Sequence, residues 1–148
     1  MSSVRSILFC CIGLMLSMDA LSSEKQVVLV VSSASPLVNL DSLELRKIYL
    51  GFNVRRNGNV IRGFRNTEDK VLNGVFLQYV VAMSAKSYNK RLLSLTLRQG
   101  IPRSSEYNSI EKLQDALSER PYSVSYMWKE DAERSTKVKA LRVLWYQN

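Results

Sequence analysis

The sequence predicts an α/β fold in which helices flank a mixed sheet. Three observations carry this prediction: an apolar, β-branched run at residues 26–32, apolar residues at helical spacing in the middle of the chain, and two strand-like runs near the end. The expected order is strand, helix, strand, three helices and two strands, which is typical of α/β proteins. No linker or repeat interrupts this order, so residues 23–148 are expected to form one domain.

Local signals define the first strand and the first helix. Between the polar Gln26 and Ser32 the chain is continuously apolar, as in a buried strand of a parallel or mixed sheet, and the Ser-Ala-Ser-Pro segment at 33–36 ends the run. Asp41 and Glu44 have the spacing of a capping box, which predicts that a helix begins after Asp41. Gly51 is suited to end that helix as its C′ residue.

The middle of the chain predicts a turn, a short strand and a long helix. Residues 56–59 contain Asn-Gly, a strong turn signal, and residues 60–64 are expected to form a short strand. Asn66 or Thr67 is expected to cap the helix that follows. The apolar stripe of that helix consists of Val71, Leu72, Val75, Phe76, Tyr79 and Val80.

The second half of the chain is expected to contain two more helices and two strands. Residues 87–98 form a helical pattern that Gly100 closes. Asn108 or Ser109 caps the next helix, whose apolar face holds Ile110, Leu113 and Leu117. The expected strands span 122–127 and 138–146.

Residues 1–22 have the three-part pattern of a secretory signal peptide. Arg5 precedes a short apolar core, and small residues favour cleavage after Ala20 or Ser22. The core is shorter than the ~20 apolar residues of a membrane-spanning helix. An uncleaved N-terminal anchor is the alternative. We therefore expect a periplasmic or secreted mature domain, 23–148, that does not span the membrane.

Composition narrows the range of functions. The chain has 21 Lys and Arg against 13 Asp and Glu, a net charge of +8, and no His. Both cysteines, Cys10 and Cys11, lie in the expected signal peptide. Without His or a mature thiol there is no Ser–His–Asp triad, Cys–His dyad or His-based metal site. A hydrolase is therefore the least favoured function, and no catalytic residue, cofactor or metal is expected.

Most charged residues are interpreted as belonging to the solvent-exposed surface. Two carboxylate groups have basic neighbours, which favours solvated ion pairs over catalysis; they are Glu111 with Asp115, and Glu130 with Asp131 and Glu133. The basic residues occur in small groups without a polybasic run. Secretion and this dispersed charge argue against nucleic acid as the partner and favour an anion or an acidic protein.

Polar side chains gather at two predicted element ends. Ser33 and Ser35 follow the first strand, and Arg65, Asn66 and Thr67 precede the long helix. Hydroxyl groups, a guanidinium and free helix amides are groups that bind an oxyanion. The same residues also serve as helix caps and loop formers, so both interpretations stay open. The predicted ligand-binding set is these five residues.

Several segments resemble one known family. Leu43 to Gly51, Leu-Glu-Leu-Arg-Lys-Ile-Tyr-Leu-Gly, is similar to the "L…IFLG" segment of small secreted proteins related to the phosphate-binding protein of the phosphate ABC transporter. The remaining matches occur in the right order over most of the mature chain. They are Asn57 to Ile61 with Arg65 and Phe76 for "G..I/V…R…F", Gly100 to Pro102 for "G.P", and Pro121 to Tyr126 for "PGAIGY".

The resemblance implies a shortened fold of the type 2 periplasmic-binding-protein kind. It also implies a non-enzymatic protein that binds phosphate or a similar small oxyanion and is linked to ABC-type phosphate uptake through a membrane transporter. The alternative is a ligand-free interaction protein of the cell envelope that keeps the fold and binds an acidic partner through its basic surface.

Overall fold

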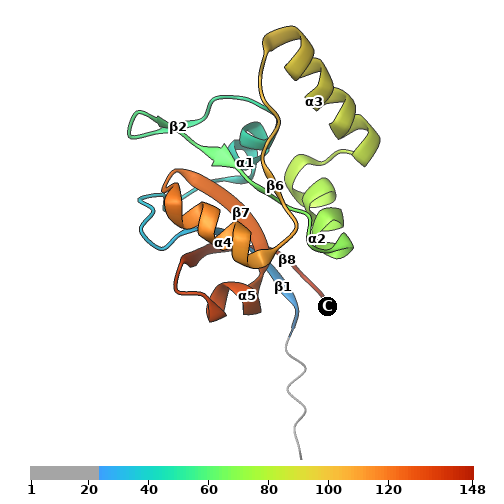
Figure 1. Ribbon diagram of the computed structural model, residues 1–148. Coiled ribbons are helices and arrows are strands. Elements are labelled where there is room, and N and C mark those ends of the chain that lie inside the picture. Colours follow the sequence, from blue (N-terminus) through green and yellow to red (C-terminus); the bar gives the residue numbers. More distant parts are fainter. Residues whose placement is uncertain (1–23) are drawn as a thin grey trace, which may run out of the picture.

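The centre of the fold is a four-stranded mixed sheet, in the order β4-β7-β1-β8. The computed structural model describes residues 24–148, so the expected signal peptide at 1–22 lies outside the described residues. Strand β1 runs antiparallel to β7 and β8, and β4 runs parallel to β7. The mixed α/β architecture expected from the sequence is therefore confirmed (Figure 1). The sheet is built from β1 (Gln26–Ser32), β4 (Arg62–Gly63), β7 (Ser123–Trp128) and β8 (Val138–Tyr146).

Two small sheets accompany the central one. Strands β2 (Arg55–Arg56) and β3 (Asn59–Val60) form a hairpin whose turn residues, Asn57 and Gly58, have φ values of +50° and +78°, as the Asn-Gly signal predicted. Strand β5 (Arg65–Asn66) pairs in parallel with β6 (Glu106–Tyr107). The single strand expected at 60–64 is thus divided among short strands.

The helices begin and end largely at the expected signals. The capping box at α1 is formed, because the Glu44 amide donates to Asp41 and the Asp41 amide donates to Glu44. Gly51 has a φ of +88°, as a C′ residue requires. The helices are α1 (Ser42–Tyr49), α2 (Lys70–Val75), the π-helix η1 (Phe76–Val81), α3 (Ala85–Gln99), α4 (Ile110–Glu119) and α5 (Lys129–Arg134). Within residues 24–148, no helix has the length and apolar character that a membrane crossing requires.

Two expectations about helices were wrong. The cap of α2 is Asp69, not Asn66 or Thr67: its Oδ1 accepts hydrogen bonds from the amides of Val71 and Leu72 at 2.7 and 2.9 Å. Asn66 instead belongs to β5, since pairing with β6 keeps it extended. Helix α5 was not expected at all, because its six residues carry no apolar stripe.

The apolar core lies on both faces of β1, which explains its unbroken apolar run. Val27, Leu29 and Val31 pack with residues of α1, α2 and η1, whereas Val28 and Val30 pack with residues of α4 and α5. Helix α3 contributes little to this core, with only Tyr88 and Leu92 among its buried residues, and Figure 1 shows it extending away from the rest of the ribbon.

Candidate functional site

The two predicted serines hold the turn that follows β1. Ser33 is exposed, and its Oγ donates to the Thr136 carbonyl at 2.7 Å. Ser35 is buried, its Oγ donates to the Pro121 carbonyl, and the same oxygen accepts from the Leu37 amide. Both hydroxyls therefore tie this turn to neighbouring backbone.

Asn66 and Thr67 are placed further along the sheet. The buried Asn66 donates through Nδ2 to the Tyr126 carbonyl at 3.1 Å, and Thr67 donates through Oγ1 to the Tyr107 carbonyl at 3.2 Å. The carbonyl that accepts from Ser35, that of Pro121, lies just before β7 begins, whereas the carbonyl that accepts from Asn66, that of Tyr126, lies within β7. The two bonded carbonyls, of Pro121 and Tyr126, are five residues apart, and a strand rises about 3.3 Å per residue, so the two halves of the predicted set lie at different levels along β7. The structure does not bring Ser33 and Ser35 together with Arg65, Asn66 and Thr67.

Arg65 is buried, and the two terminal nitrogens of its guanidinium donate to other side chains, whereas its buried Nε has no hydrogen-bond partner among the described residues. Its Nη1 donates to Glu106 at 2.8 Å, and its Nη2 donates to Asn73 at 2.6 Å. The guanidinium carbon lies 4.8 Å from the ring centre of Phe76 and 5.3 Å from that of Tyr88. We call these five residues the Arg65 cluster. The positive charge of Arg65 is thus already paired with the carboxylate of Glu106.

The phenols around the Arg65 cluster are neutral. Burial raises the pKa of Tyr88 to about 12, although the charge of Arg65 acts in the opposite direction. Burial likewise raises the pKa of Tyr49 and of Tyr126. The rings therefore serve Arg65 as uncharged packing partners, and Glu106 is its counterion.

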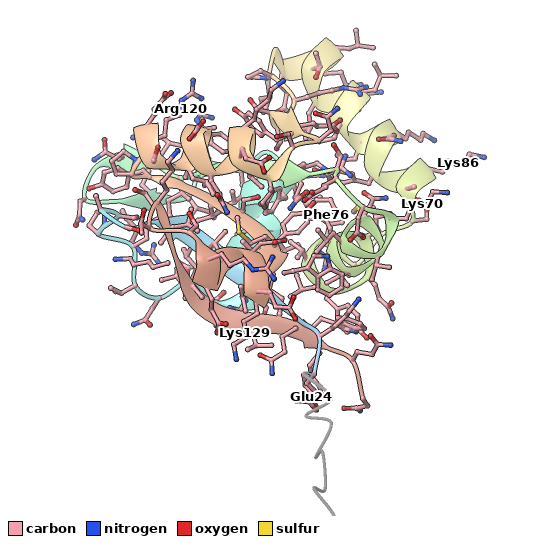
Figure 2. The ribbon with its side chains drawn as sticks, turned by 60° about the horizontal axis from the view of Figure 1, so that its bottom comes forward. Glu24, Lys70, Phe76, Lys86, Arg120 and Lys129 are labelled. Carbon is pink, nitrogen blue, oxygen red and sulfur yellow. The ribbon has the colours of Figure 1, made fainter. Side chains whose placement is uncertain are left out.

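A cleft of about 520 Å³ opens beside the Arg65 cluster, between the end of α1, strand β4 and the segment 100–105, whose Ser105 carbonyl accepts from the Arg65 amide at 2.9 Å. Three basic side chains line it: Arg62, Arg103 and Arg120. We call it the arginine cleft. Among the described residues its lining contains no acidic side chain, and Ser104 and Ser105 add hydroxyl groups. Figure 2 shows Arg120 near the end of α4 and well apart from Phe76 of the Arg65 cluster.

Each cleft arginine is placed by a different local feature. Arg62 is exposed at the start of β4, where its amide donates to the Tyr122 carbonyl at 2.9 Å. Arg103 follows Gly100, which ends α3 in the left-handed conformation with a φ of +63°. Arg120 is the C-cap residue of α4, and its guanidinium carbon lies 5.7 Å from the ring centre of Phe64.

The three cleft arginines lack a counterion among residues 24–148. None of them forms an ion pair within the part of the chain that the structure describes. Three unmatched positive charges around a concave surface favour an anion there. From the sequence these arginines were interpreted only as scattered surface charge, because the contacts that bring them together are tertiary.

The carboxylates interpreted as surface behave as expected where they lie on α5. Lys129 faces Glu133 at 3.7 Å and Arg134 faces Glu130 at 3.8 Å, both at helical i,i+4 spacing and with largely exposed side chains. Glu111 and Asp115 lie exposed on α4, and Asp115 pairs with Lys137. Such exposed pairs contribute little energy and provide no buried acid.

No protein-family model matches the sequence, and a search of curated proteins finds no match. Solved structures do match the fold. An ABC-type phosphate transport receptor from Vibrio cholerae is 17% identical with a TM-score of 0.51, over 80% of this chain and 46% of that chain. A putative phosphate ABC transporter substrate-binding protein with bound phosphate, from Clostridium perfringens, is 12% identical with a TM-score of 0.59, over 80% of this chain and 45% of that chain.

A third structure extends the pattern. A possible phosphate-binding protein from Planctomyces limnophilus is 17% identical with a TM-score of 0.55, over 80% of this chain and 41% of that chain. The chain thus spans less than half the length of these structures. At such identities the likeness concerns the fold. This chain has, in shortened form, the α/β fold of the substrate-binding proteins of phosphate ABC transporters.

Proposed function

We propose that this protein is a non-enzymatic binding protein for phosphate or a similar small oxyanion, and that the anion binds in the arginine cleft. The observation that carries the proposal is the absence of any acidic residue from a concave surface lined by Arg62, Arg103 and Arg120. A guanidinium presents a planar fork of donors that matches two phosphate oxygens at once. The serine hydroxyls of the segment 100–105 complete a set of donors.

The cellular setting is part of the same proposal. The matched structures are named as phosphate transport receptors or phosphate-binding proteins, and this supports a small anion as ligand and a role beside an ABC-type transporter. The predicted signal peptide supports a periplasmic or secreted location, in which a membrane transporter or an envelope protein is the partner. This chain spans less than half of those structures. The role beside a transporter is therefore proposed for residues 23–148 and not for a complete substrate-binding protein.

A second candidate function is supported by the Arg65 cluster. The guanidinium that the sequence predicted as an anion ligand is occupied by Glu106 and Asn73, and the amides at the start of α2 are capped by Asp69. A fold that pairs the terminal nitrogens of Arg65 and the first amides of α2 internally suits a ligand-free interaction protein of the cell envelope. Such a protein would use its basic surface, net charge +8, to bind an acidic partner.

Calorimetric titration of the purified protein with inorganic phosphate and with sulfate tests the leading function. We expect saturable binding that Arg62→Ala, Arg103→Ala or Arg120→Ala each weakens about tenfold, since each loses a charge-assisted contact. Arg134→Ala, an exposed arginine on α5, is the matched control and should bind as the wild type does.

The same titration separates the cleft from the predicted set. Thr67→Ala removes one hydroxyl of that set without touching the cleft, so it should leave phosphate affinity unchanged. If Thr67→Ala abolishes binding while the cleft variants keep it, the anion binds at the predicted set. Absence of any heat with either anion rejects the leading function, and salt-sensitive capture of an acidic envelope protein would then support the second one.

A further inference from the structure

The arginine cleft is larger than a bare oxyanion needs. Its volume of about 520 Å³ lies within the ~300–1,000 Å³ that small-molecule sites occupy in proteins. Phosphate and sulfate have five heavy atoms, so either ion fills a small part of such a space. The remaining volume is available to an organic body attached to the anion.

The walls of the cleft suit an apolar body. Phe52, Leu95 and Ile101 line it, and Phe52 is 53% exposed although it is a large aromatic residue. The guanidinium carbon of Arg91 lies 5.5 Å from that ring, on which it packs. An exposed aromatic ring beside a concave surface is a ready stacking partner for a planar ligand.

The apolar and the cationic groups are within reach of a single small molecule. Ile101 and Arg103 belong to the same short segment, 100–105, and Phe52 follows Gly51, where an added Cβ would lie 3.6 Å from Ile101. Three positive charges without a carboxylate favour a doubly charged anionic group over a singly charged one, and they disfavour neutral or cationic ligands.

We infer that the ligand of the arginine cleft is an aromatic phosphate monoester, whose phosphate group contacts the arginines and whose ring packs against Phe52 and Ile101. This inference rests on the proposed function and specifies its ligand class. The phosphate group provides charge and geometry for the guanidinium forks, and burial of the ring adds the apolar contribution that a bare ion lacks.

Calorimetric titration of the purified protein with 1-naphthyl phosphate, inorganic phosphate and 1-naphthol tests the inference. We expect 1-naphthyl phosphate to bind at least tenfold more tightly than inorganic phosphate, and 1-naphthol to give no measurable binding. Phe52→Ala should reduce the affinity for 1-naphthyl phosphate about fivefold and leave that for inorganic phosphate unchanged. Tyr146→Ala, an equally exposed aromatic residue outside the cleft, is the matched control.

The outcomes distinguish this inference from the proposed function. If inorganic phosphate and 1-naphthyl phosphate bind equally well, the aromatic ligand class is rejected and the oxyanion function stands. If 1-naphthol binds as tightly as 1-naphthyl phosphate, the phosphate group adds nothing to that affinity and the inference is rejected, while the titration with inorganic phosphate decides the proposed function by itself. If neither phosphate compound binds, the inference and the proposed function are both rejected. Loss of inorganic phosphate binding in Phe52→Ala would overturn the separate role given to the aromatic wall.

Discussion

The Arg65 cluster and the arginine cleft use the same side chain for opposite purposes. Arg65 is 8% exposed, its two terminal nitrogens donate to Glu106 and Asn73, and two aromatic rings enclose its guanidinium. The cleft arginines are exposed and have no carboxylate partner within residues 24–148. Arg65 therefore stabilises the fold, whereas the charge of the cleft is left for something outside the chain.

The comparison separates two meanings of a basic residue. Inside the protein a cation is tolerated only when a carboxylate and hydrogen-bond acceptors satisfy it, and these leave little capacity for a ligand. At a concave surface an unmatched cation costs little and attracts anions. The binding capacity of an arginine thus depends on where its counterion comes from.

The largest expected effect comes from removing the internal arginine. Arg65→Ala should lower the free energy of unfolding by about 3 kcal/mol, because it leaves a cavity beside Phe76 and Tyr88 and an unpaired Asn73. Urea unfolding followed by circular dichroism measures it. Glu106→Gln is the companion variant; since the Glu106 side chain is 54% exposed, its loss of charge should cost less than about 1 kcal/mol. Equal stability of Arg65→Ala and the wild type would contradict the structural role.

The second effect tests the contact between the two regions. Tyr49 lines the arginine cleft, and its ring also packs against Phe76 at 4.9 Å between ring centres. A Cβ added at Gly63 would lie 2.6 Å from the Tyr49 ring, so Gly63→Ala should displace that ring and lower the free energy of unfolding by about 2 kcal/mol.

A second glycine provides the control for Gly63. Gly74 lies in α2 with no atom within 4 Å of an added Cβ, so Gly74→Ala should stabilise the protein by up to about 1 kcal/mol through helix propensity. Both variants are compared by thermal unfolding. A stability change of opposite sign in the two variants supports the close contact at Gly63. A change of the same sign would show that the Tyr49 ring moves aside at no cost in stability.

Much of the fold could be predicted because its signals are local. The capping box at Asp41, the C′ glycine at 51 and the Asn57–Gly58 turn each depend on a few adjacent residues, and the structure forms all three. The bounds of β8 also agree with the expected strand, 138–146, since this stretch is rich in aliphatic, β-branched and aromatic residues. Local chemistry decides these features before any tertiary contact exists.

The rest depends on contacts between distant segments. Asn66 was expected to cap a helix, yet pairing of β5 with β6 holds it in a strand and leaves the cap to Asp69. The arginine cleft joins residues 62, 103 and 120, whose proximity no local pattern reveals. The missed helix α5 packs Ala132 onto the sheet, and six residues are too few to show a helical period.

A smaller effect concerns the carboxylate that caps α2. Burial acts to raise the pKa of Asp69, but hydrogen bonds from the Leu72 amide, the Trp128 indole and the Val71 amide, together with the charge of Lys25, outweigh it and lower that pKa. A lowered pKa in the folded state contributes stability above the pKa of the unfolded chain, and that stability is lost as the pH falls through the folded value.

Asp69→Asn tests this linkage. Asparagine still caps a helix but loses the charge and weakens the bond to Trp128, so we expect a loss of about 1 kcal/mol at pH 7. The difference between variant and wild type should shrink when urea unfolding is repeated below pH 3. A difference that stays constant from pH 7 to pH 2 would show that the Asp69 charge contributes nothing to stability.

The smallest effect is the one that most directly tests the comparison. If the cleft arginines have no structural partner, Arg62→Ala, Arg103→Ala and Arg120→Ala should each change the free energy of unfolding by no more than about 0.5 kcal/mol, although each weakens phosphate binding. Arg120 is the strictest case, because its guanidinium also lies over the Phe64 ring. A loss above about 1 kcal/mol in any variant would place that arginine with Arg65 as a structural residue. Unchanged stability together with weaker phosphate binding is the result expected of a ligand-binding surface. A side chain that the fold does not use can be removed without lowering the free energy of unfolding.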